Sequence, residues 1–105
     1  MTLAIDFDGV IHDPTDKAPG YKMGKPLPGA QLALKILHDR GATLIIHTLW
    51  AREPAGKKAC EQWLNYFGFT IDEVTALKPK ADIYIDDRGY HFTTWLEALA
   101  MLDTV

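Results

Sequence analysis

Four acidic residues are the side chains whose types and spacing most clearly indicate chemistry. Asp6 and Asp8 are separated by one residue, and Asp86 and Asp87 are adjacent near the other end of the chain. Four carboxylates brought to one place would repel one another unless a cation lay between them. Because no histidine or cysteine accompanies them at a matching spacing, these oxygen ligands favour Mg²⁺ over zinc. A magnesium ion held in this way keeps coordination positions for water and a substrate phosphate.

An aspartate beside Mg²⁺ can attack phosphorus to give an aspartyl-phosphate, a form of covalent catalysis. A second carboxyl two residues later can protonate the leaving oxygen and then activate water. We expect Lys78 and Thr48 to contact the oxygens of the transferring phosphoryl group. His12, Trp50 and Arg52 are candidate substrate contacts, since an arginine can clamp a phosphate and an aromatic ring can stack on a base.

Apolar segments that stop at these polar residues predict β-strands. Strands are predicted over 2–5, 43–47 and 82–85, with a shorter one at Val74. Between them, apolar residues repeat at helical spacing, which predicts helices that alternate with the strands. The predicted helices lie between Pro28 and Gly41, between Pro54 and Gly68, and from Thr94 to Leu102.

This alternation predicts a single α/β domain over residues 1–105. We expect a Rossmann-like fold of three layers, in which a central, mainly parallel sheet is covered on both faces. Ligands of such sheets bind beyond the carboxyl ends of the strands. The four aspartates and Thr48 each follow such an end, so we expect them to share one edge of the sheet. The Pro/Gly-rich segment 12–29 predicts an extended loop.

In this order, the motifs resemble those of the haloacid dehalogenase-like superfamily. Residues 3–10, an apolar strand followed by Asp-Phe-Asp-Gly-Val, look like its first motif. The resemblance implies that Asp6 is the nucleophile and Asp8 the general acid/base. Residues 44–48 look like the second motif, whose terminal Ser or Thr, here Thr48, binds the phosphoryl group.

The later motifs of the superfamily also have counterparts in this chain. The Lys78-Pro79 pair is similar to the third motif, although the segment is short and Lys80 lies nearby. Asp86 and Asp87 end an apolar strand, as in the fourth motif. The resemblance implies a Mg²⁺ site made by Asp6, the backbone carbonyl of Asp8 and this acidic pair. The more common Gly-Asp version of the pair aligns Asp87 with the direct ligand and leaves Asp86 a water-mediated role.

The short loop between the first two motifs stands where larger members insert a cap domain. The resemblance therefore implies a capless, Mg²⁺-dependent phosphomonoesterase with an open site, which could receive a cap from a second copy in a homo-oligomer. Its substrate could be a nucleotide, a sugar phosphate or the phosphorylated end of a nucleic acid, and the motifs do not select among them. The alternative is a non-catalytic binding module of the same fold that still binds metal.

Composition agrees with one globular domain and argues against two kinds of partner, membranes and non-specifically bound nucleic acid. The chain has 105 residues, of which 48% are hydrophobic and 24% charged, with a net charge of −3. This charge gives no basic field for non-specific binding of nucleic acid. A single cysteine, no signal peptide and no apolar run that could span a membrane predict a cytoplasmic protein.

Overall fold

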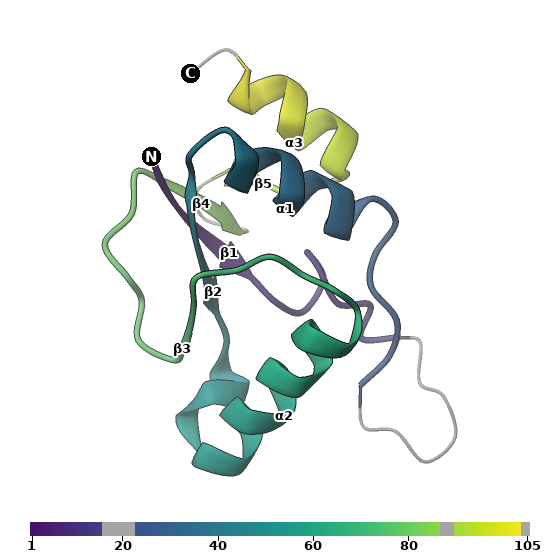
Figure 1. Cartoon of the computed structure of the whole chain (residues 1–105), viewed down its shortest axis with the longest axis vertical. Helices are drawn as coiled ribbons and strands as arrows, with labels where there is room; N and C mark the ends of the chain where they lie inside the picture. Colours follow the sequence, from purple (N-terminus) through teal and green to yellow (C-terminus); the bar gives the residue numbers. More distant parts are fainter. Residues whose placement is uncertain (16–22, 87–89, 104–105) are drawn as a thin grey trace.

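A computed structural model describes residues 1–15, 23–86 and 90–103, and Figure 1 shows the whole chain. The predicted strands and helices are present, and the structure adds a short 3-10 helix, η1, and a short strand, β5. The centre of the predicted loop 12–29 lies outside the described residues. In chain order the elements are β1 (Thr2–Asp6), α1 (Ala30–Asp39), β2 (Thr43–His47), η1 (Leu49–Arg52), α2 (Pro54–Tyr66), β3 (Glu73–Thr75), β4 (Ile83–Asp86), β5 (Tyr90–His91) and α3 (Trp95–Leu102).

The strands form one sheet in the order β3-β2-β1-β4-β5, and every neighbouring pair is parallel. From the central β1, the chain moves outward through β2 to β3 and then crosses to the far side of β1 for β4 and β5. The strand order therefore reverses beside β1, which is where sheets of this kind bind ligands. The predicted α/β, Rossmann-like fold with a parallel sheet is confirmed.

One face of the sheet carries the main hydrophobic core. Its side chains pack in a single core with apolar residues of all three α-helices, and α1 and α3 lie side by side above it (Figure 1). Burial of these aliphatic side chains is the main favourable term for the fold, at roughly 1.5–3 kcal/mol each. The strand residues that form this face are Leu3, Ile5, Leu44, Ile46, Val74 and Ile85.

On the other face, the crossover segment 76–82 contacts the sheet through Tyr84. The tyrosine hydroxyl donates to the carbonyl of Pro79 at 2.7 Å and accepts from the backbone N–H of Ala81 at 3.2 Å. Tyr84 is partly buried and stands beside Ala4 of β1, which is buried. The segment between β3 and β4 is too short for a helix with its two connections, so an extended chain takes the position of a helix here.

None of the helices in the described residues has the length and apolar character that crossing a membrane requires.

Candidate active site

The carboxyl ends of the five strands place a row of polar side chains across the sheet. Asp6 pairs with His47 of β2, and because Ile5 pairs with Ile85, the next residues, Asp6 and Asp86, are neighbours across β1 and β4. Paired residues of parallel strands point to the same face, so these side chains lie on the face opposite the main core. We call this set the strand-end row: Thr75, His47, Asp6, Asp86 and His91.

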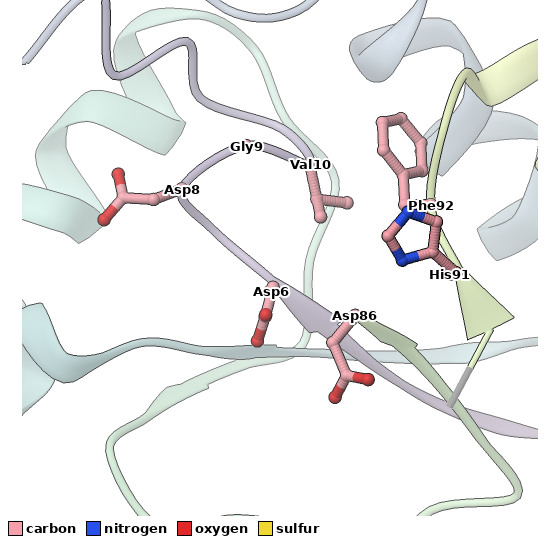
Figure 2. Close-up of a pocket in the computed structure, with 7 residues that line it drawn as sticks. All are labelled: Asp6, Asp8, Gly9, Val10, Asp86, His91 and Phe92. Atoms are coloured by element: carbon pink, nitrogen blue, oxygen red, sulfur yellow. The ribbon is translucent and has the colours of Figure 1, made fainter. Parts of the chain in front are cut away.

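A pocket opens at this edge, where the strand order reverses. Figure 2 shows that the carboxylates of Asp6 and Asp86 point the same way, whereas the carboxylate of Asp8 points away from both. Two adjacent carboxylates, rather than three, therefore stand at the centre of the site. The lining residues are Asp6, Asp8, Gly9, Val10, Asp86, His91 and Phe92.

The carboxylate oxygens at this edge fit Mg²⁺ better than a metal ion whose ligands are all protein side chains. In the described ranges, no three His, Cys, Asp or Glu side chains are grouped closely enough to hold a metal. Mg²⁺ commonly binds one or two carboxylates and completes its octahedron with water and phosphate oxygens. Asp6 and Asp86 supply such a pair, and Asp8 could add only its backbone carbonyl. Asp87, the expected direct ligand, lies outside the described residues.

A tight turn directly after β1 sets the position of Asp8. The backbone N–H groups of Ile11 and His12 both donate to the carbonyl of Phe7, at 3.1 Å and 2.9 Å. Gly9 lies in the left-handed region at φ +81°, a conformation that glycine adopts without the steric cost of a side chain. The turn brings Asp8 and His12 together, and the Nδ1 of His12 lies 2.6 Å from the Oδ1 of Asp8.

His12 is buried behind Asp8, with only 3% of its surface exposed. Its ring stacks on Phe7 at a centroid distance of 4.9 Å, and the edge of Trp63 meets it at 5.5 Å. Its Nε2 accepts a hydrogen bond from the backbone N–H of Gly24 at 2.8 Å. Both ring nitrogens are occupied, so the structure places His12 in support of Asp8 instead of in the predicted contact with substrate.

The short helix η1 brings Trp50 to the site, and Thr48 precedes it. The indole N–H of Trp50 donates to the Oδ2 of Asp8 at 3.2 Å, so this side chain does lie at the site. Thr48 is 6% exposed, and its hydroxyl accepts from the backbone N–H of Trp50 at 3.2 Å. Thr48 thus caps η1, and it is absent from the pocket lining. Arg52, the last residue of η1, is exposed.

Lys78 lies over the sheet face that carries the strand-end row. Its ammonium is 4.7 Å from the ring centroid of Tyr84, a cation–π contact. Tyr84 precedes Asp86 by two residues on β4, and therefore points to the same face. Both Lys78 and Lys80 are exposed, and the structure shows no comparable contact for Lys80 within the described residues.

Three residues outside the predicted site also lie at this edge: His47, His91 and Phe92. The Nδ1 of His47 lies 3.8 Å from the Oδ1 of Asp6, and its Nε2 lies 3.2 Å from the carbonyl of Ala76. Because a carbonyl only accepts, Nε2 carries the hydrogen. His47 could have been selected as the last residue of a predicted strand, whereas His91 and Phe92 depend on β5, which is too short to show a pattern.

Comparison with known proteins identifies the fold and no family. No protein-family model matches the chain, and no curated protein matches its sequence. A solved structure of a conserved protein from Bacteroides thetaiotaomicron is similar, with a TM-score of 0.77 and 26% sequence identity. The similarity covers 99% of this chain and 90% of that chain. The α/β fold described above is therefore shared almost from end to end.

Proposed function

We propose that this chain is a Mg²⁺-dependent phosphomonoesterase of the haloacid dehalogenase-like type, with Asp6 as its nucleophile. The observation that carries the proposal is that Asp6 and Asp86, which directly follow the paired Ile5 and Ile85, line one pocket at the point where the strand order reverses. One or two carboxylates at a ligand-binding edge are the protein ligands that Mg²⁺ commonly takes. The order of the sequence motifs supports the same assignment.

In the proposed reaction, a carboxylate oxygen of Asp6 attacks phosphorus while the bond from phosphorus to the ester oxygen breaks. Asp8 gives its proton to the departing alcohol, and then takes a proton from the water that hydrolyses the aspartyl-phosphate. Lys78, held over the same sheet face, offsets negative charge on the phosphoryl oxygens. A bound Mg²⁺ would supply further positive charge beside Asp6 and Asp86.

The first prediction is that the purified chain hydrolyses phosphomonoesters only when Mg²⁺ is present. The panel should include aryl phosphates, nucleotides, sugar phosphates and oligonucleotides phosphorylated at either end. Chelation should abolish turnover, and Asp6→Asn should lower it by about 10³-fold or more because the nucleophile is lost. The matched control is Asp39→Asn, on the exposed surface of α1, which should leave turnover unchanged.

Equal activity in Asp6→Asn and the unaltered chain would refute the assignment of the nucleophile. Binding of Mg²⁺ without turnover of any ester in the panel would instead support the alternative, a non-catalytic module that binds metal.

A further inference from the structure

We propose that His12 is a positioning residue for the reaction assigned above: it fixes the orientation of Asp8, the carboxyl that serves as general acid/base. The inference rests on the proposed function and adds to it a residue that does not touch the substrate. It starts from the two hydrogen bonds of the buried imidazole, to Asp8 and to Gly24.

The partners of His12 determine which ring nitrogen carries the hydrogen. A backbone N–H can only donate, so the Nε2 facing Gly24 must accept and carries no hydrogen. The hydrogen of the neutral ring is therefore on Nδ1, from which it is donated to the Oδ1 of Asp8. The opposite tautomer would place two hydrogens against each other at Gly24 and leave Asp8 without this donor.

The imidazole is held in place by two hydrogen bonds and two ring contacts. Gly24 stays beside it because its carbonyl accepts from the indole N–H of Trp63 at 2.8 Å. The rings of Phe7 and Trp63 prevent the imidazole from tilting. A buried polar ring is stable only if its hydrogen bonds are satisfied, so these partners keep one orientation of His12.

Asp8 receives a second donor from the opposite side, the indole N–H of Trp50 on Oδ2. We call His12 and Trp50 together the Asp8 clamp. With one donor on each oxygen the carboxylate cannot rotate freely, and it faces away from Asp6 and Asp86 (Figure 2). A phosphoryl group bound to Asp6 thereby gains room between the carboxylates. About two of the four acceptor sites of the Asp8 carboxylate remain available to bind the proton that Asp8 transfers in the reaction.

The clamp has a chemical consequence that depends on the leaving group. In the first step the bond from Asp6 to phosphorus forms, the ester bond breaks and the proton of Asp8 goes to the departing oxygen. An alkoxide needs this proton, whereas p-nitrophenolate is stable enough to depart without it. If the clamp serves the acid role of Asp8, its loss must impair alkyl esters far more than p-nitrophenyl phosphate.

The experiment compares kcat/KM for benzyl phosphate and p-nitrophenyl phosphate, which share one aromatic ring and differ in leaving group. His12→Ala should lower kcat/KM for benzyl phosphate by about 10²-fold and for p-nitrophenyl phosphate by less than about 10-fold. His12→Asn keeps an N–H donor near the position of Nδ1 and should recover part of the loss. Cys60→Ala, at another fully buried position of the core, is the control and should leave the ratio of the two rates unchanged.

Equal losses on both esters in the Ala and Asn variants would overturn the proposal, because a purely structural residue would not distinguish leaving groups. Thermal unfolding identifies any variant that fails to fold, and the ratio is then read from the Asn variant. If the unaltered chain hydrolyses neither these two esters nor any ester of the panel above, the proposed function fails and the clamp is tested by ¹⁵N NMR. A His12 ring that carries its hydrogen on Nε2 would overturn the proposal without any assay of activity.

Discussion

Lys78 and Lys80 are separated in the chain by one proline, yet only Lys78 is held over the ring of Tyr84. This contact keeps its ammonium on the sheet face of Asp6 and Asp86. We therefore predict that Lys78→Ala lowers kcat/KM about 10²-fold, since a cation near the phosphoryl oxygens is lost. Lys80→Ala serves as the matched control and should change it less than about 3-fold. The measurement is steady-state kinetics on an aryl phosphate. A reversed ranking would assign the contact with the phosphoryl oxygens to Lys80 instead of Lys78.

Residues that directly follow a strand could be placed from the sequence, because the carboxyl ends of parallel strands meet at one edge. Asp6 and Asp86 are found together for this reason. The role of His12 could not be predicted in the same way. It depends on the turn after Phe7 and on Gly24. The chain near Gly24 is held beside this turn, where the backbone N–H of Leu27 donates to the carbonyl of Ile11 at 2.9 Å. Contacts of this kind leave no periodic signal.

Among the elements, η1 was missed because four residues are too few for a helical pattern. Its position against α2 depends on one glycine. A Cβ added at Gly56 would lie 2.1 Å from the carbonyl oxygen of Trp50, far inside contact distance. The absence of a side chain at Gly56 therefore lets η1 approach α2 closely enough for Trp50 to reach Asp8.

We predict that Gly56→Ala destabilises the fold by about 1–3 kcal/mol, as overpacking does. Helix propensity alone predicts the opposite sign, a gain of up to about 1 kcal/mol. Urea unfolding therefore distinguishes the two effects, and a more stable variant would show that η1 does not press on α2. The exposed Lys57→Ala in the same helix should stay within about 0.5 kcal/mol of the unaltered chain. Hydrolysis of alkyl esters should fall with Gly56→Ala, because Trp50 moves from Asp8.

The architecture of the whole molecule was the most predictable feature. Alternating apolar strands and helices determine the α/β class, and strong segments such as 43–47 and 54–66 were located almost to the residue. The order of the strands was not predicted, since a parallel sheet joins residues far apart in the chain. No helix was predicted between Val74 and residue 82 and none is present there, but the contact of this short segment with the sheet through Tyr84 was not predicted.

Cys60 is fully buried in this core, so the ionisation of its thiol depends on whether the chain is folded. Burial, together with the nearby charges of Asp8 and Glu61, raises the pKa of its thiol from 9.0 to about 12. Between these values the unfolded chain loses the thiol proton and the folded chain keeps it, so rising pH favours unfolding.

We therefore predict that the free energy of unfolding falls by up to about 1.4 kcal/mol per pH unit above about pH 9 through this group alone. The measurement is urea unfolding of the chain and of Cys60→Ala from about pH 8 to about pH 11, with the difference between them plotted against pH. This difference should shrink as the pH rises. A constant difference would mean that the thiol ionises equally in both states.

The strand-end row also has a consequence for how the protein is made. Each of its five residues comes from a different strand, and Asp6 leaves the ribosome long before its neighbour Asp86. Pairing between β1 and β4 is non-local, and such pairing forms late in folding. The nascent chain therefore carries Asp6 without its partner carboxylate through most of its synthesis. The two can meet only after β4 has emerged and inserted beside β1.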